Sequence, residues 1–202
     1  GNAEGNGEQQ QTHCIVNGNH QQQKPGQRAV GLVLLDHHQC GGRSGGGCVY
    51  SDKGNIMISY ISPRGEVAAV FDRYLSAMTS CLASLGLNAE KSGRNDILVD
   101  GRKVSGNAFC QLPDRSIVHG TLLYDTDFDA LEEAIRPPVE KLQRHGVASV
   151  RQRVSNLKDK LALTPISSVE QLEQFIVEYF CDGKIVLPKE VIGEIETISA
   201  GF

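Results

Sequence analysis

Apolar positions recur at helical spacing in two segments of the chain, which predicts two amphipathic helices. The stripe in residues 66–85 is followed by Gly86, a typical residue after a helix C-terminus. The stripe in residues 168–181 begins with Ser168 and Gln171, which are spaced as a capping box, and is followed by Gly183. The first stripe comprises Val67, Val70, Phe71, Tyr74, Leu75, Met78, Leu82 and Leu85; the second comprises Val169, Leu172, Phe175, Ile176, Tyr179 and Phe180.

Shorter apolar runs, some of them alternating with polar residues, predict strands between and after these helices. Two of the runs flank Asp100-Gly101, which supplies the positive φ angles of a type I′ turn and therefore predicts a β-hairpin. Because strands interleave with helices, the fold class is α/β or α+β. The predicted strands are 48–50, 55–61, 97–99, 102–109, 118–124 and 184–187; further helices are predicted at 127–135, capped by Asp127, from Pro138 to a stop at Gly146, and from Lys189.

Composition divides the chain into a tail and one domain. Residues 1–27 contain seven Gln, five Gly and four Asn, so we expect a low-complexity, disordered tail. Residues 28–202 are expected to form the domain, within which residues 28–42 are atypical and are not assigned to an element.

The overall composition is that of a soluble globular protein, with 40% hydrophobic and 22% charged residues. The net charge of -4, without a Lys/Arg block, argues against a nucleic-acid partner. The apolar run at residues 30–35 is too short to span a bilayer. No secretion signal opens the chain, so we expect a cytoplasmic protein whose six cysteines are free thiols.

Three segments could carry chemistry. Gly45, Gly46 and Gly47 would let backbone N–H groups approach a phosphate or carboxylate, although short glycine runs taken alone more often form a turn without a ligand. Strand alternation predicts Lys103, Ser105 and Asn107 on one face, which could bind an anion or be merely solvated. His119, at a strand position, is either a structural residue or a base. The histidines lack acidic or cysteine partners at metal-binding spacing, which argues against zinc.

Taken together, these segments resemble lipoate–protein ligases, in the order in which that family has them. The matching motifs are Ser44-Gly45-Gly46-Gly47-Cys48-Val49-Tyr50-Ser51-Asp52, Gly93-Arg94-Asn95-Asp96, Arg102-Lys103-Val104-Ser105-Gly106-Asn107-Ala108, His119-Gly120-Thr121-Leu122-Leu123 and Arg153-Val154-Ser155-Asn156-Leu157. The resemblance implies a biotin/lipoate ligase-like α+β fold with a mixed β-sheet flanked by helices.

The resemblance also implies an activity in two steps. Lipoate and ATP, with Mg²⁺, would form lipoyl-AMP, and a lysine of a lipoyl domain or a glycine-cleavage H protein would then take the lipoyl group. Lys103 would be the catalytic residue, and Asp96 could contact Mg²⁺. The protein would act as a monomer. Substrate and nucleotide contacts would come from Arg43, Ser44, Gly45, Gly46, Gly47, Val49, Tyr50, Asn95, Asp96, Ser105, Gly106, Asn107, His119, Gly120 and Thr121.

The sequence departs from the family at both ends. Gly41 and Gly42 stand where the family usually has paired arginines, and no C-terminal accessory domain is expected after Phe202. Two alternatives to a complete ligase therefore stay open. One is a lipoyl or octanoyl transferase of the same fold, with Cys48 or Cys110 as nucleophile. The other is a non-catalytic remnant that binds lipoate without turnover.

Overall fold

The computed structural model describes residues 13–16, 30–35, 50–93, 95–134, 153–181, 183, 190–191, 193–194 and 197. These residues form a seven-stranded sheet in the order β1-β2-β3-β7-β6-β5-β4. Neighbouring strands pair antiparallel. Among the described residues, Lys103 and Val154 form an isolated parallel bridge. The strands are β1 (His13–Val16), β2 (Val30–Leu35), β3 (Asn55–Pro63), β4 (Ala89–Ser92), β5 (Asp96–Val99), β6 (Arg102–Gln111) and β7 (Arg115–Leu123).

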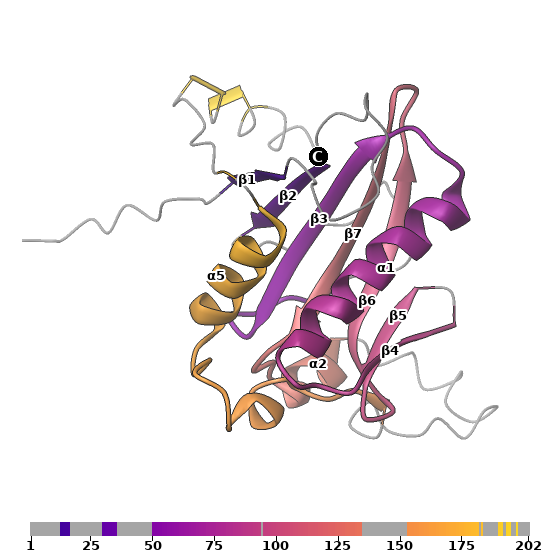
Figure 1. Ribbon diagram of the computed structural model, residues 1–202. Coiled ribbons are helices and arrows are strands. Elements are labelled where there is room, and N and C mark those ends of the chain that lie inside the picture. Colours follow the sequence, from indigo (N-terminus) through magenta and orange to yellow (C-terminus); the bar gives the residue numbers. More distant parts are fainter. Residues whose placement is uncertain are drawn as a thin grey trace, which may run out of the picture.

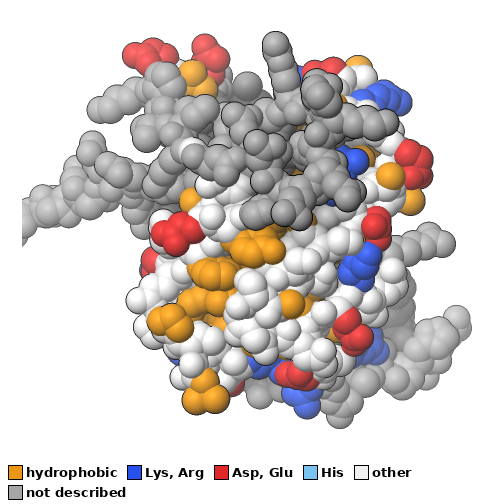
Figure 2. Space-filling view, in the orientation of Figure 1, with side chains coloured by type: hydrophobic (Ala, Val, Ile, Leu, Met, Phe, Trp, Pro, Cys, Tyr) orange, Lys and Arg blue, Asp and Glu red, His pale blue; other side chains and the backbone are white. Residues whose placement is uncertain are grey.

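Two helices cover one face of this sheet (Figure 1). Helix α1 (Val67–Ser84) packs over β4, β5 and β7, and α5 (Val169–Phe180) packs over β2 and β3. Figure 2 shows this helical side, where hydrophobic side chains gather in a diagonal band near α5. The arrangement confirms the α+β class, but the expected mixed sheet is wrong for the described strands, which pair antiparallel. The core between helices and sheet includes Ile56, Ile58, Tyr74, Met78, Leu82, Ile97, Val118, Leu122, Leu172 and Ile176.

The ends of both long helices follow from their sequences. Glu66 caps α1 by accepting hydrogen bonds from the N–H groups of Ala68 and Ala69, and Gly86 follows at a φ of 82°. Ser168 caps α5 through Gln171 N–H, as predicted, but the Gln171 side chain accepts from Ser167 N–H instead of Ser168. The predicted stripes are confirmed except at the first residue of α1, since Val67 is 42% exposed.

The β5–β6 hairpin confirms the turn prediction, because Asp100 and Gly101 have φ angles of 52° and 74°. Helix α2 (Phe128–Ala134) begins as predicted after Asp127, whose carboxylate accepts hydrogen bonds from the N–H groups of Asp129 and Ala130. A 3₁₀ turn, η1 (Asp159–Leu161), leads toward α5.

Three strands differ from the sequence-based expectations. Strand β1 lies within the predicted tail but pairs with β2, since a composition taken over 27 residues conceals the short run Cys14-Ile15-Val16. Strand β2 lies within residues 28–42, which the sequence did not assign to an element. Strand β4 has the polar sequence AEKS, which carries no apolar pattern, and is recruited by pairing with β5.

Some predicted elements lie outside the described residues. These are the helix from Pro138 to Gly146, the strand at 184–187, and Cys48 and Val49 of the predicted strand 48–50. Tyr50, the last residue of that prediction, is described and lies outside any strand. In the described part of the chain, no helix has the length and apolar character needed to cross a membrane.

Candidate active site

A β-bulge in β6 decides which residues share a face with Lys103. Lys103 pairs with Leu98, whereas Ser105 pairs with Ile97, so Val104 is an extra residue in the ladder. Because Ile97 and Leu98 point to opposite faces, Lys103 and Ser105 do so too. The expectation that Lys103, Ser105 and Asn107 share a face is therefore wrong, since strict alternation does not allow for a bulge.

The Lys103 side chain lies on the face of the sheet away from α1. Its ammonium Nζ is 2.8 Å from Asp96 Oδ1, and the two side chains are 36% and 31% exposed. Asp96 Oδ1 is itself shielded from solvent and receives no hydrogen bond, so the contact is an ion pair without hydrogen-bond geometry. A positive charge is thus held at a partly open position.

Three further expected site residues share this face. Gly106 and Thr121 are cross-strand partners, and so are Ala108 and His119 on the next rungs of the same ladder. Burial lowers the pKa of His119 below its ordinary value of 6.5, which keeps the imidazole neutral at physiological pH. The face also carries partly buried apolar side chains beside these residues, namely Met57, Ile61, Ala108 and Ile117.

Ser105 and Asn107 point to the helical face and are almost fully buried, with 3% and 4% exposure. The Asn107 amide donates 2.9 Å to Asn95 O and 3.1 Å to Ser105 Oγ. Asn95 returns a 2.8 Å bond from its own amide to Asn107 O. Ser105 and Asn107 therefore support Asn95, which precedes Asp96 at the start of β5, and they do not face the Lys103 side.

Gly120 completes this supporting group. A Cβ on Gly120 would overlap the Asn107 amide oxygen and lie 2.7 Å from Gly106 O. The glycine is needed because the Asn107 side chain occupies that volume. Its effect on the site is through packing and not through contact with the Lys103 face.

Residues 153–157, which were not among the expected site residues, lie beside Lys103. Ser155 N–H donates to Lys103 O at 2.9 Å, next to the bridge between Lys103 and Val154. Asn156 accepts from Thr126 N–H at 3.0 Å and donates to Thr126 O at 3.0 Å. This segment thus fixes the start of β6 against the end of β7. The motif at 153–157 was visible in the sequence, but amide-to-backbone pairing has no sequence signature.

Tyr50 lies ahead of β3, in a network organised by Asp52. The Asp52 carboxylate accepts from Tyr50 OH at 3.0 Å, Gly54 N–H at 2.8 Å and Asp127 N–H at 2.8 Å. Burial, reinforced by the Asp52 carboxylate, raises the pKa of Tyr50 to about 12. Tyr50 is therefore neutral and held in place. The other expected residues of that motif, Arg43, Ser44, Gly45, Gly46, Gly47 and Val49, lie outside the described residues.

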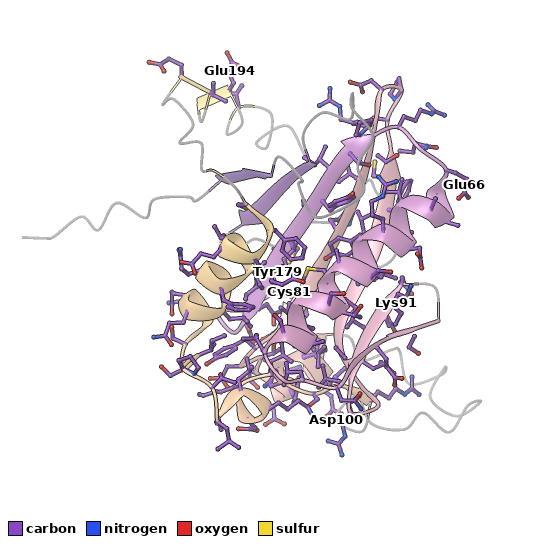
Figure 3. All side chains as sticks on the ribbon, in the orientation of Figure 1. Glu66, Cys81, Lys91, Asp100, Tyr179 and Glu194 are labelled. Carbon is purple, nitrogen blue, oxygen red and sulfur yellow. The ribbon has the colours of Figure 1, made fainter. Side chains whose placement is uncertain are left out.

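Thiols and metal ligands were the remaining expectations. Cys81 and Cys110 are free thiols, and burial raises the pKa of the Cys81 thiol to about 12. Figure 3 places Cys81 on α1 beside Tyr179 of α5, on the helical side of the sheet. Among the described residues, no three His, Cys, Asp or Glu side chains gather as a metal site.

Known proteins that resemble this chain are lipoate–protein ligases. Lipoate–protein ligase 1 of Staphylococcus aureus is 37% identical over 76% of this chain and 43% of its own length. The lipoate-protein ligase of Bacillus subtilis is 41% identical over 58% of this chain and 36% of its own length. The chain thus spans about two fifths of the length of these relatives.

Solved structures agree on the fold. A bipartite lipoate protein ligase of Thermoplasma acidophilum, studied with its E2 lipoyl domain, is 26% identical with a TM-score of 0.58, over 68% of this chain and 54% of that one. A lipoate-protein ligase A bound with ATP is 23% identical with a TM-score of 0.55, over 68% of this chain and 55% of that one, which supports the fold alone. The sequence model of the lipoyl protein ligase A/B catalytic domain matches residues 9–181. The chain belongs to the lipoyl protein ligase A/B catalytic-domain family.

Proposed function

We propose that this chain is the catalytic core of an ATP-dependent lipoate–protein ligase. The observation that carries the proposal is the Lys103 ammonium, held by Asp96 on a partly open, mixed polar and apolar face. The relatives named as lipoate–protein ligases, at 37% and 41% identity, support the same activity. Of the expected site residues, Asp96, Gly106, His119 and Thr121 lie on the same face as Lys103.

In the first half-reaction, a lipoate carboxylate oxygen attacks the α-phosphorus of ATP and pyrophosphate leaves. Negative charge grows on the phosphoryl oxygens as the new O–P bond forms. The fixed Lys103 ammonium stabilises that charge, an electrostatic effect that requires no proton transfer. Asn95, which Asn107 supports, and Asp96 flank the nucleotide at the start of β5.

In the second half-reaction, the neutral amine of an acceptor lysine attacks the acyl carbonyl of lipoyl-AMP. The amide bond forms, AMP leaves with the electron pair of the C–O bond, and the amine loses a proton. Lys103 again lies where it stabilises charge on the phosphate. His119, being neutral, presents a polar but uncharged wall.

The lipoyl chain needs an apolar surface next to the cation. Met57, Ala108 and Ile117 supply such apolar surface on the Lys103 face; Met57 pairs with Thr121 and Ala108 pairs with His119. We assign the hydrocarbon tail to this surface. The glycines of residues 45–47 remain expected contacts to the adenylate.

Mg²⁺ would accompany ATP, since this ion typically binds through one or two carboxylates together with substrate phosphates. Asp96 is the candidate carboxylate; its Oδ1 accepts no hydrogen bond but is shielded from solvent and paired with Lys103 at 2.8 Å, so an ion at Oδ1 would have to displace the ammonium. Bound there, the ion would neutralise phosphate charge. Mg²⁺ and the Lys103 ammonium would then compete for the Asp96 carboxylate.

We further propose that the acceptor is a lipoyl domain of a 2-oxoacid dehydrogenase or a glycine-cleavage H protein. The Thermoplasma acidophilum ligase, studied with its E2 lipoyl domain, supports this partner class. We also propose that the protein acts in the cytoplasm as a monomer.

An acyltransferase of the same fold is the second candidate, and one observation favours it. Cys110 pairs with Ile117, so it shares the Lys103 face with His119, which lies diagonally across the β6–β7 ladder. A thioester mechanism would need this thiol or another one. Cys81 is unsuited to the role because burial keeps it protonated.

One experiment separates these candidates. The protein is mixed with ATP, lipoate and an apo H protein; pyrophosphate release is followed and the acceptor is weighed by mass spectrometry. ATP-dependent lipoylation that survives iodoacetamide treatment supports the ligase. Thiol-sensitive acyl transfer from an octanoylated carrier without ATP supports the transferase. Lack of modification by either route, and from supplied lipoyl-AMP, indicates a remnant.

A further inference from the structure

The Lys103 ammonium lies over the backbone of Gly106, three residues further along the same strand. A Cβ built on Gly106 would be 2.8 Å from Lys103 Nζ and 2.9 Å from Cε. Both separations are below 3.0 Å, which real Cβ atoms essentially never show. The end of the lysine side chain therefore occupies space that any other residue at position 106 would fill.

Two features of β6 combine to produce this contact. The bulge at Val104 turns Lys103 onto the face that carries Gly106, away from Ser105. The side chain then folds along the strand and reaches Asp96, the cross-strand partner of Gly106, at 2.8 Å. Without the bulge Lys103 would point to the helical face, and with a Cβ at position 106 the end of the lysine side chain would have to shift from its place beside Asp96.

We propose that Gly106 is a positioning residue that acts on the reaction through Lys103. This inference rests on the proposed ligase function and deepens it. Gly106 matters through the path it leaves for the ammonium and not as a wall against the ligand. The vacant Cβ position and the Asp96 carboxylate together fix the cation where the α-phosphate and acyl oxygens meet.

The test is a double-mutant cycle between Gly106→Ala and Lys103→Ala. In Gly106→Ala the ammonium must move by about 0.6 Å to reach ordinary contact at 3.4 Å. A misplacement of about 1 Å can cost about a hundredfold in rate, so for this smaller shift we expect a loss of between about tenfold and a hundredfold in lipoyl-AMP formation. In the Lys103→Ala background the added methyl should cost less than about twofold, because the atom it displaces is gone.

Gly65→Ala is the matched control, since its added methyl would meet a side chain, Val70 Cγ2, at 3.1 Å and lies outside the site. This variant should keep the wild-type rate. An unchanged rate in Gly106→Ala, or an equal loss in both backgrounds, would overturn the proposal. If Gly106→Ala folds poorly, its melting temperature should recover in Gly106→Ala/Lys103→Ala; failure to recover would overturn the proposal as well.

A crystal structure of Gly106→Ala separates this inference from the proposed function. We expect Lys103 Nζ to leave Asp96 Oδ1, whereas an unmoved ion pair at 2.8 Å would contradict the positioning role. If the wild-type protein makes no lipoyl-AMP, the proposed function fails. The position of Lys103 in the variant still decides whether Gly106 controls it.

Discussion

The two faces of the β5–β6–β7 sheet carry polar residues of the same motif, but in opposite circumstances. On the helical face, Ser105 and Asn107 are buried and bonded to each other and to the Asn95 backbone. On the other face, Lys103 and Asp96 are about one third exposed and make an ion pair without hydrogen-bond geometry. Neighbouring residues of the chain thus divide into a buried, hydrogen-bonded group and a partly open ion pair.

The difference shows why polarity alone does not identify a site residue. A buried amide with satisfied hydrogen bonds stabilises the fold, because leaving a buried group unsatisfied costs free energy. A partly open cation contributes little to stability but can interact with a ligand. Substitutions on the two faces should therefore change different quantities.

Lys103→Ala should give the largest effect on rate. We expect a loss of about a hundredfold or more in lipoyl-AMP formation, because one electrostatic contact to the transition state disappears. The melting temperature should barely change, since the ion pair is partly exposed. The matched control is Lys91→Ala, which removes an exposed pair with Asp72 and should leave the rate intact. An equal loss of rate in both variants would contradict a special role for the lysine on the Lys103 face.

Asn107→Ala should give the largest effect on stability. It leaves Asn95 O without its side-chain donor and removes the bond to Ser105, so we expect about 1–3 kcal/mol of destabilisation in urea unfolding. The rate per folded molecule should fall far less than in Lys103→Ala. Asn88→Ala, at an exposed asparagine, serves as the control and should unfold like wild type. A stable Asn107→Ala with a hundredfold rate loss would place Asn107 among the ligand contacts.

Asp52→Asn, beside Tyr50 and ahead of β3, should give the smallest effect, a change in the pKa of Tyr50. Because the folded-state pKa of Tyr50 is about 12, unfolded chains ionise from pH 10 upward while the folded ones do not, so stability is lost over that window. Asp52→Asn removes the charge and the carboxylate acceptor but not the burial, the largest cause. The Tyr50 pKa should fall but stay above 10, which tyrosinate absorbance against a Tyr50→Phe reference would measure. An unchanged pKa would show that Asp52 has no influence on Tyr50.

Much of the fold could be predicted from local patterns. The helical stripes of α1 and α5, the Asp100-Gly101 turn and the Asp127 cap each rest on a local rule, and each is confirmed. Strands β1 and β4 could not be predicted, because their pairing is decided by a neighbouring strand and not by their own sequences.

Three of the expected site residues lie together in the structure, but their geometry was not predictable. The motifs identified Lys103, Asp96 and Gly106, and the structure brings those three together. Strict alternation placed Lys103 with Ser105 and Asn107, since a bulge at Val104 depends on the register between two strands. The contacts of Asn156 and Asp52 were missed because side chain-to-backbone bonds across a fold leave no local pattern.

Methyl NMR with a non-hydrolysable lipoyl-adenylate analogue tests the central claim, that the Lys103 face binds the adenylate, most directly. Ala108 of β6 and Ile117 of β7 report on that face. Val118 and Leu122, also in β7, report on the helical face. We predict that the Ala108 and Ile117 methyl signals shift on titration while those of Val118 and Leu122 stay nearly fixed. Shifts confined to Val118 and Leu122, or no shifts at all, would contradict the assignment of the site.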